Sequence, residues 1–366
     1  MTAGPAATET LVEAKAGGAF SGGPLHRTLV VGFGHSGHFH LDALRKLERE
    51  HTAEEFAHEP VGVVDPYLDR LDVHGDDGPL TFFRTLEAAR GEFAPELTVV
   101  HVCTPPATHA EVLRAAVEAG YRKFVVEKPM ANTLGDVESI RTLEAAHDDV
   151  QILVVANWLV SRLTDAVGRH LAETEPGVQV TDVALRQAKP RFSRSLANYS
   201  HKSVFDVELP HLVALACRLF GTDLRLVTAH CTDMVVNDVR LPSMGTGHIG
   251  LATRDGTRIR LYSDLASPLR ERSIRVAWSD GRSLWGHYPC SSLDHHSQLM
   301  LVDESERLVD RAIFYDDTFR AFMTSAYAYL HGAGPKPVSD VELNAAVCTL
   351  LVAAKAACGL GEAEAA

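Results

Sequence analysis

Hydrophobic and polar residues follow two different rhythms along the chain. Between residues 27 and 156, short apolar runs such as RTLVV, PVGVV, LTVVHV and RKFVV alternate with segments of helical spacing such as HFHLDALRKLEREH and THAEVLRAAVEAG. The apolar runs are too short for helices and place valine at successive positions, which is typical of strands buried on both faces. Five such alternations predict a parallel sheet with helices on both faces.

After about residue 160 the rhythm changes. One helical segment, RLTDAVGRHLAET, is followed by segments that alternate apolar and polar positions, among them VQVTDVALRQA, HIGLATRDGTRIRLYSDL and RSIRVAWSDGRSLWGHY. Asp255-Gly256 and Asp280-Gly281 lie inside these segments and predict hairpin turns. The helical segment LPHLVALACRLFG lies in this half, and two more helical segments end the chain. We expect an open, mainly antiparallel sheet with helices on one face.

Composition and charge narrow the function classes. The chain of 366 residues has a net charge of −13, which disfavours nucleic acid or an anionic membrane as the main partner, because both attract a basic face. Its six cysteines include no C-x-x-C pair, which favours free thiols in a reducing compartment. No apolar segment has membrane-spanning length. We expect a cytoplasmic protein that binds neither nucleic acid nor membrane.

A glycine-rich turn follows the first predicted strand. The stretch VVGFGHSGHFH contains Gly32-x-Gly34-x-x-Gly37, where a strand ends and a helix begins. In such a turn the first glycine allows the tight bend, the second lets the backbone approach a pyrophosphate, and the third lets helix and strand pack closely. The helix N-terminus then faces the phosphates. The turn predicts a dinucleotide site that includes Gly32, Phe33, Gly34, His35, Ser36 and Gly37.

An acidic residue ends the second predicted strand. Asp65 follows PVGVV and lies 28 positions after Gly37. A carboxylate at this place can accept hydrogen bonds from the adenosine ribose and would repel a 2′-phosphate. We therefore predict NAD as the cofactor, with NADP less favoured, although Arg70 is near enough in sequence to keep NADP open. Alternatively, Asp65 is a turn residue before Pro66.

Several segments resemble the Gfo/Idh/MocA family, the group of glucose–fructose oxidoreductase and inositol dehydrogenase, and the likeness as a whole extends over nearly everything from residue 28 onward. They are the glycine loop GFGHSGHFH with His40 after its last glycine, VVHVCTPPATHAEVL with Thr104, Pro105 and His109, FVVEKPMA with Glu127, Lys128 and Pro129, HLVALACRLFG with His211 at its start, and the C-terminal PVSDVELNAAVCTLLVAAKAA. The motifs are specific in combination.

The resemblance implies a Rossmann domain followed by an open-sheet α/β domain, whose sheet face commonly makes a subunit interface. It also implies hydride transfer between a nicotinamide and a secondary alcohol of a sugar or cyclitol. Lys128 matches the family's catalytic lysine, and His211 matches the histidine that donates or accepts the proton at the substrate oxygen. A histidine suits this role because it titrates near neutral pH. The implied cofactor site also includes Thr104, Pro105, His109, Glu127, Lys128 and Asn157.

The sequence departs from the family just before His211. The family has an aspartate four positions before this histidine, where this chain has Val207, with Asp206 and Glu208 on either side. Residues three apart share a helical face, so Glu208 is the better candidate to tune His211, unless it is an exposed acid of the first turn. Asp206 either contacts the substrate or forms a capping box with Ser203.

The start of this helix and the stretch before it leave alternatives open. A helix from Ser203 would be kinked by Pro210, whereas a helix from about Leu209 would accept the proline in its first turn. Upstream, the stretch RQAKPRFSRSLANYSHK either holds a phosphate or carboxylate of the substrate or forms a solvated loop. Its basic residues are Lys189, Arg191, Arg194, His201 and Lys202. Trp158, which follows the last Rossmann strand, lines the sugar pocket or packs between domains.

Together these features predict an α/β chain with a disordered leader (1–26), a dinucleotide-binding Rossmann domain (27–156) and a substrate-binding and oligomerisation domain (157–366). We expect an NAD-dependent oxidoreductase of a sugar, sugar phosphate or cyclitol, assembled as a homodimer or homotetramer. The predicted substrate contacts are Lys128, Trp158, Lys202, Asp206, Glu208 and His211. No metal is expected, because the spacing of His35, His38, His287, His295 and His296 fits no standard zinc pattern. The alternatives are an enzyme that oxidises transiently before elimination or hydrolysis, and a non-enzymatic sensor of dinucleotide and sugar.

Overall fold

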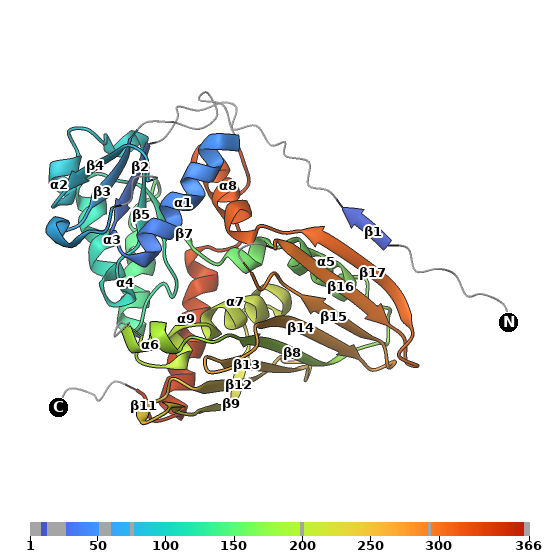
Figure 1. Ribbon diagram of the computed structural model, residues 1–366. Helices are drawn as coiled ribbons and strands as arrows, with labels where there is room; N and C mark the ends of the chain where they lie inside the picture. The colour runs from blue at the N-terminus through green and yellow to red at the C-terminus, as the bar shows by residue number, and fades with distance from the viewer. Residues whose placement is uncertain are drawn as a thin grey trace. The chain divides into compact units, whose positions relative to one another are not determined.

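The chain divides into two compact units, each built from separate stretches of sequence (Figure 1). The computed structural model describes residues 9–12, 27–50, 60–73, 77–197, 201–291 and 294–361. The parallel-sheet unit comprises Ala16–Asn157 and Phe319–Cys348, and the mixed-sheet unit comprises Met1–Lys15, Trp158–Thr318 and Thr349–Ala366.

The parallel-sheet unit contains a six-stranded sheet with the order β4-β3-β2-β5-β6-β7, in which every pair of neighbours is parallel. Every residue of β3 and β5 is buried, which explains the unbroken apolar runs in the sequence. The predicted parallel sheet is confirmed. Its strands are β2 (Arg27–Val31), β3 (Val61–Val64), β4 (Leu80–Phe83), β5 (Thr98–Val102), β6 (Lys123–Val126) and β7 (Gln151–Val154).

Helices pack on both faces of the parallel sheet. On one face, α1 lies beside α8, where the rings of Phe39 and Phe319 are 4.2 Å apart. On the other face, Val100 and Phe124 share one core with α3, α4 and the first half of α9. The helices are α1 (His35–Glu50), α2 (Leu86–Ala89), α3 (His109–Glu118), α4 (Leu134–Ala145), α8 (Thr318–Leu330) and α9 (Val341–Ala357), with short η1 (Leu68–Arg70), η2 (Pro95–Leu97) and η3 (Pro106–Thr108).

The mixed-sheet unit contains a nine-stranded sheet with the order β1-β17-β16-β15-β14-β8-β13-β12-β9. The pairs β1–β17 and β8–β13 are parallel, and the other neighbours are antiparallel. The predicted turns at Gly256 and Gly281 lie between β12 and β13 and between β14 and β15, both with positive φ. The strands are β1 (Glu9–Val12), β8 (Val180–Ala188), β9 (Arg225–Cys231), β12 (Thr246–Ala252), β13 (Arg258–Asp264), β14 (Glu271–Trp278), β15 (Ser283–His287), β16 (His296–Val302) and β17 (Leu308–Tyr315), with a separate hairpin of β10 (Met234–Val236) and β11 (Val239–Leu241).

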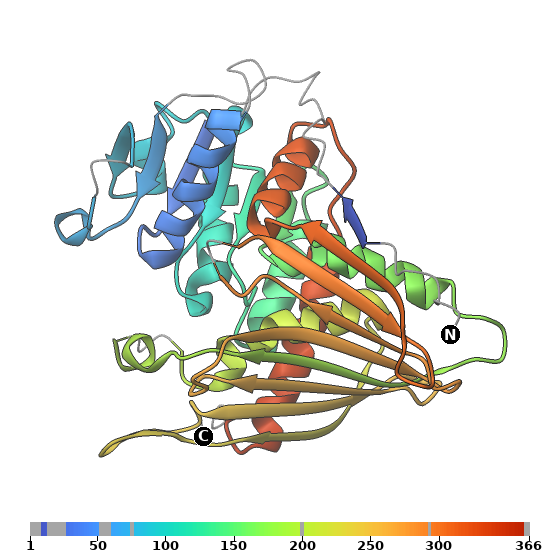
Figure 2. The ribbon, with the colours of Figure 1, turned by 45° about the vertical axis from the view of Figure 1, so that its right-hand side comes forward.

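Two helices, α5 (Arg162–Ala172) and α7 (Leu209–Phe220), cover one face of the nine-stranded sheet. Helix α7 contacts β8 and β13, and α5 contacts β15, β16 and β17; Figure 2 shows both helices on the same side of the strands. Buried and exposed residues alternate along β13 and β14, as expected when only one face of a sheet is covered. The remaining elements are α6 (Phe192–Ala197), η4 (Asn157–Val160) and η5 (Val204–Asp206).

The structure changes two expectations about the chain's organisation. Glu9–Val12, expected in a disordered leader, form β1 and pair with β17; the other residues of 1–26 lie outside the described residues. Phe319–Cys348 belong to the parallel-sheet unit rather than to a continuous C-terminal domain, because α9 contributes Val341 and Ala345 to the core of the parallel sheet. Among the described residues, no helix is both long enough and apolar enough to cross a bilayer.

Candidate active site

The glycine turn joins β2 to α1 and leaves one side open. Gly32 has a φ of +87°, and a Cβ on this residue would lie 2.9 Å from the backbone nitrogen of Thr104. A Cβ on Gly37 would lie 2.5 Å from the carbonyl oxygen of Gly32, whereas a Cβ on Gly34 would meet nothing within 4 Å. Gly32 and Gly37 are therefore required by the fold itself, and Gly34 faces open space, as the close approach of a pyrophosphate requires.

Asp65, directly after β3, joins the glycine turn to the second strand. Its Oδ2 accepts the N–H of Phe33 at 3.0 Å, and its Oδ1 accepts the N–H of Tyr67 at 2.8 Å. The second contact is the turn contact considered as an alternative role for Asp65. Each carboxylate oxygen can accept a further hydrogen bond, so the contacts leave Asp65 able to receive ribose hydroxyls.

His109 braces two loops at the carboxyl ends of the parallel strands. Its Nε2 lies 2.9 Å from the carbonyl oxygen of Thr104, after β5, and its Nδ1 lies 3.1 Å from that of Met130, after β6. The ring is fully buried, and this burial lowers the pKa of His109. Thr108 donates from its hydroxyl to the carbonyl of Pro105 at 2.8 Å. The structure thus brings the predicted Thr104, Pro105 and His109 together.

Glu127 and Lys128 form the turn after β6. Glu127 Oε2 accepts the N–H of Lys128 at 3.0 Å, and Oε1 lies 3.0 Å from Nε2 of His40 in α1. Burial alone would raise the Glu127 pKa, but the hydrogen bond from His40, together with the charge and backbone N–H of Lys128, lowers it to about 2. The Lys128–Pro129 peptide is cis. An ionised, doubly bound Glu127 therefore fixes the backbone of Lys128.

In the mixed-sheet unit, His211 lies in the first turn of α7. The helix begins at Leu209, so Pro210 occupies its first turn and does not kink it. The imidazole of His211 stacks with Trp158, with ring centroids 5.4 Å apart and an interplanar angle of 16°. Trp158 also stacks with Tyr288 at 5.0 Å. Tyr288, missed by sequence reasoning, reaches this site from the end of β15, and no local motif marks it.

Glu208 is buried, with 4% of its surface exposed, and its carboxylate turns toward the end of β8. It accepts a hydrogen bond from the Gln187 amide and pairs with the Lys189 ammonium, while Arg191 Nη1 lies 3.8 Å from Oε1. The backbone N–H of His211 donates to the Glu208 carbonyl at 3.1 Å. The exposed first-turn alternative is therefore wrong, and a tuning role toward His211 stays a prediction.

Asp206 closes the short helix η5 and ties it to α9. Its Oδ2 accepts the backbone N–H of Ser203 at 2.9 Å and the Ser203 hydroxyl at 3.0 Å, and the N–H of Lys202 at 3.2 Å. Oδ1 pairs with Lys355 of α9. The capping-box alternative is confirmed, so this carboxylate already has partners within the protein.

The other residues predicted for the site lie near the ends of helices and strands. His35 and Ser36 open α1, and Asn157 begins η4 directly after β7. His38, one of the histidines considered for a metal, lies 2.9 Å through Nδ1 from the Gly34 carbonyl oxygen. Within the described part of the chain, no group of three or more possible metal ligands occurs. Lys128 belongs to the parallel-sheet unit and His211 to the mixed-sheet unit.

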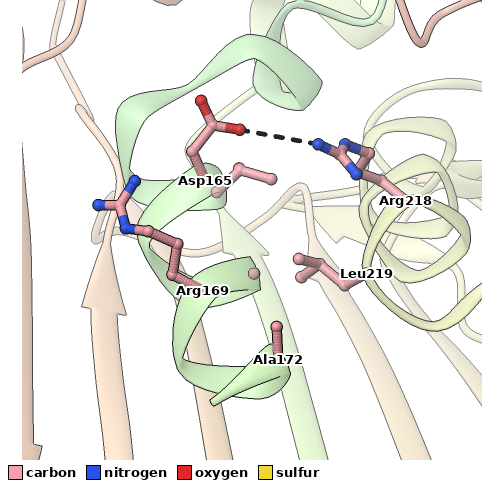
Figure 3. Close-up of a pocket in the computed structure, with 7 residues that line it drawn as sticks. Asp165, Arg169, Ala172, Arg218 and Leu219 are labelled. Carbon is pink, nitrogen blue, oxygen red and sulfur yellow. Dashed lines mark ion pairs between the residues drawn. The ribbon is translucent and has the colours of Figure 1, made fainter.

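A separate hollow of about 450 Å³ lies between α5 and α7. Figure 3 shows Asp165 of α5 facing Arg218 of α7 across it, with a carboxylate–guanidinium distance of 3.8 Å. Burial raises the pKa of Asp165. None of the residues predicted for the active site lines this hollow, whose lining is Thr164, Asp165, Gly168, Arg169, Ala172, Arg218 and Leu219.

Comparison with solved structures shows the same fold in sugar-modifying enzymes. UDP-N-acetylglucosamine 3-dehydrogenase from Acidithiobacillus ferrooxidans is 17% identical with a TM-score of 0.69, and the match covers 91% of this chain and 97% of that chain. The WlbA dehydrogenase from Bordetella pertussis, solved with NADH and UDP-GlcNAcA, is 16% identical with a TM-score of 0.68 (91% and 96% covered). A 3-ketoreductase from Actinomadura kijaniata, solved with NADP and TDP-benzene, is 18% identical with a TM-score of 0.70 (92% and 98% covered).

A family match agrees with the turn geometry. The oxidoreductase family with an NAD-binding Rossmann fold matches residues 26–155, which include the glycine turn, Asp65 and the Glu127–Lys128 turn. The open side at Gly34 fits the dinucleotide that this family binds. Residues 26–155 of this chain are therefore similar to the NAD-binding Rossmann domains of the Gfo/Idh/MocA oxidoreductase family.

Proposed function

We propose that this chain is an NAD-dependent dehydrogenase that acts on a secondary alcohol of a sugar or cyclitol. The observation that carries this proposal is the turn after β6, where the ionised Glu127 accepts the N–H of Lys128 and so fixes the backbone that bears a candidate catalytic lysine. The names of the neighbours, two dehydrogenases and a ketoreductase, support the same class of reaction.

The glycine turn and Asp65 would hold the dinucleotide. The open side of Gly34 admits the pyrophosphate, and the N-terminus of α1 favours its negative charge. Asp65 would accept ribose hydroxyls while it keeps its bonds to the backbone of Phe33 and Tyr67. When bound, the nicotinamide supplies the acceptor or donor of the hydride.

His211 and Lys128 would act on the substrate oxygen. Removal of a hydride from an alcohol carbon requires that the hydroxyl proton leave as well, and the His211 imidazole would accept it. The stack with Trp158 holds the orientation of this ring. The Lys128 ammonium would donate a hydrogen bond to the same oxygen and stabilise the developing negative charge. Glu208 would tune His211 from the residues just before α7.

The substrate of this proposed enzyme carries an acidic group. Lys189 and Arg191 lie beside the single carboxylate of Glu208, and Arg272 is near enough to Lys189 to lower its pKa. We name these three residues the cation cluster. Arg191 is 8% exposed, and its Nε has no hydrogen-bond partner in the described part of the chain. The guanidinium carbon of Arg272 lies 5.4 Å from the ring centroid of Trp158, which stacks with His211. A phosphate or carboxylate would balance this positive charge.

A panel of matched sugars tests the proposed reaction. We expect reduction of NAD, measured as absorbance of the reduced nicotinamide, to be faster with glucuronate or glucose 6-phosphate than with glucose, and slower with NADP. UDP-N-acetylglucosamine and inositol extend the panel to a nucleotide sugar and a cyclitol. Tight sugar binding with no turnover would favour a sensor, and chemical change of the sugar without net NADH would favour transient oxidation.

Two substitutions test the assigned residues. Lys128→Ala and His211→Ala are each expected to lower kcat by about 100-fold or more, the size of a lost general acid–base or charge-stabilising group. NAD affinity, measured by calorimetry, should change little because neither side chain belongs to the glycine turn. Unchanged turnover in either variant would contradict the role given to that residue.

A further inference from the structure

A line of five polar side chains crosses the interior of the parallel-sheet unit and ends at Glu127. His40 Nε2 lies 3.0 Å from Glu127 Oε1, and His40 Nδ1 lies 2.8 Å from His101 Nδ1. His101 Nε2 lies 2.9 Å from the Tyr327 hydroxyl, which in turn contacts the Thr28 hydroxyl. The rings of His40, His101 and Tyr327 have no exposed surface.

The two facing nitrogens constrain where the protons lie. Only one of two ring nitrogens 2.8 Å apart can carry a hydrogen toward the other, so one histidine donates and its neighbour accepts. At the Glu127 end, an ionised carboxylate can only accept, so His40 must donate through Nε2. We take His40 to carry only this one hydrogen, so that its Nδ1 accepts the Nδ1–H of His101.

The hydrogen bonds at the Thr28 end of the line can run in the same direction, from Thr28 toward Glu127. Burial lowers the pKa of His101 well below its usual value, so this ring is neutral, and with its one hydrogen on Nδ1 its Nε2 is an acceptor. Burial raises the pKa of Tyr327, so its hydroxyl keeps the proton that it donates to His101. The Thr28 hydroxyl then donates to the Tyr327 oxygen. Every bond in the line has one donor and one acceptor.

We infer that Thr28, Tyr327, His101 and His40 form a one-directional chain of hydrogen bonds that delivers a donor to Glu127, and that His101 and Tyr327 are positioning residues for Lys128. Glu127 receives the chain through Oε1 and holds the Lys128 backbone through Oε2. Residues on β2, β5, α1 and α8 are thereby joined to one turn after β6. The role proposed for Lys128 rests on the proposed function, whereas the direction of the chain does not.

The proton positions can be read directly by NMR. With ¹⁵N-labelled histidine in the full chain, without cofactor, long-range proton–nitrogen correlations distinguish the two tautomers, and single-histidine variants assign the signals. We expect His40 to carry its hydrogen on Nε2 and His101 on Nδ1. A hydrogen on Nε2 of His101, or hydrogens on both nitrogens of His40, would overturn the inferred direction whether or not the protein has dehydrogenase activity.

A matched pair of tyrosines tests the positioning role. Tyr327→Phe removes the donor to His101, and Tyr121→Phe removes a comparably buried hydroxyl that donates to the Phe93 carbonyl at 3.2 Å in the same unit. Both variants should lose similar stability. We expect only Tyr327→Phe to lower kcat, by about fivefold to tenfold, the effect of one lost hydrogen bond, with the KM for NAD unchanged. Equal kcat values for the two variants would refute the positioning role.

Two substitutions of His101 distinguish a hydrogen-bonding role of this side chain from a role that only fills space in the core. Asn offers a donor near the place of Nδ1, whereas Leu fills the space and offers none. If His101 only fills the core, Leu is the better replacement, since it buries no polar group. We expect His101→Asn to retain several times more turnover than His101→Leu although it is the less stable of the two. The reverse order of turnover would contradict the inferred link.

Discussion

Asp206 and Glu208 are two positions apart, yet their carboxylates have different partners. Asp206 binds the backbone before η5, as the Ser203-x-x-Asp206 spacing predicts. Glu208 instead meets Lys189 and Arg191. Because α7 starts at Leu209, Glu208 is the cap residue just before the helix, and the rule for residues three apart does not by itself fix the direction of its side chain. Sequence spacing predicts partners that are close in the sequence. Lys189 and Arg191, which follow β8, come close to Glu208 only once the sheet has folded.

The side chain of Lys189 should lose its proton at a lower pH than an ordinary lysine. Burial, assisted by Arg272 and Arg191 and opposed by Glu208, lowers its pKa to about 8. We expect amine acylation at Lys189, followed by mass spectrometry, to reach half its maximal rate near pH 8, well below pH 10.5, the ordinary value for a lysine. Since the unfolded chain keeps this proton to about pH 10.5, Lys189 should make the fold more stable as pH rises from 8 to 10.5. A midpoint for Lys189 near pH 10.5 would contradict this.

Asp206→Asn should lower the stability of the fold and leave the catalytic rate unchanged. The substitution removes the charge that pairs with Lys355 and weakens the acceptor of the Ser203 N–H. For a largely buried ion pair we expect a loss of about 2 kcal/mol or more in the free energy of unfolding, measured by urea denaturation. Asp238→Asn, at an exposed position, is the control. If the pH–rate profile moves while stability stays, Asp206 acts on the substrate instead.

At the scale of elements, the turn from β2 to α1 separates structural from ligand-facing glycines. Gly34→Ala places a methyl group in open space, so the stability of the fold should be kept while the affinity for NAD falls by about tenfold, because the backbone can no longer approach the pyrophosphate. Gly91→Ala, also in open space but outside the turn, is the matched control and should leave NAD affinity unchanged. Calorimetric titration with NAD measures both. Unaltered affinity in Gly34→Ala would remove the turn from the cofactor site.

The hydrophobic pattern best predicts the elements whose residues are all in the same environment, such as strands buried on both faces. Strands β3 and β5 are buried on both faces, so their apolar runs identify them. Strand β17, which the sequence did not reveal, reads LVDRAIFY, and its residues are mostly exposed or half-buried, so its alternation is weak. Tyr288 and Arg272 reach Trp158 through sheet pairing. Such contacts depend on strand order, which the local pattern does not contain.

At the scale of the whole molecule, the face of the nine-stranded sheet opposite α5 and α7 carries exposed aromatic and charged side chains. Trp285 on β15 is 37% exposed, and the Arg275 guanidinium lies 4.3 Å from its ring centroid. Tyr262 on β13 contacts both His248 and Arg186. Aromatic and arginine side chains are enriched at interfaces between proteins. We therefore propose that a second copy of the chain covers this face, in line with the family resemblance.

A charge placed at the centre of this face should prevent assembly. Trp285→Asp is expected to convert the assembly to a monomer in light scattering at micromolar concentration, because the charge would be desolvated at the interface. Val235→Asp, at a 66% exposed position on the separate β10–β11 hairpin, should leave the mass unchanged. If both variants keep the wild-type mass, another surface makes the contact or the chain is monomeric.

The division of α9 between the two units has a consequence for how the chain is made. Val341, Ala345 and Cys348 belong to the core of the parallel sheet, although its last strand ends at Val154. Tyr327, the partner of His101, also comes late in the sequence. A ribosome that has synthesised all six parallel strands has therefore not yet supplied the residues that complete their core. The core of the parallel-sheet unit can be completed only after residues 341–348 have been synthesised.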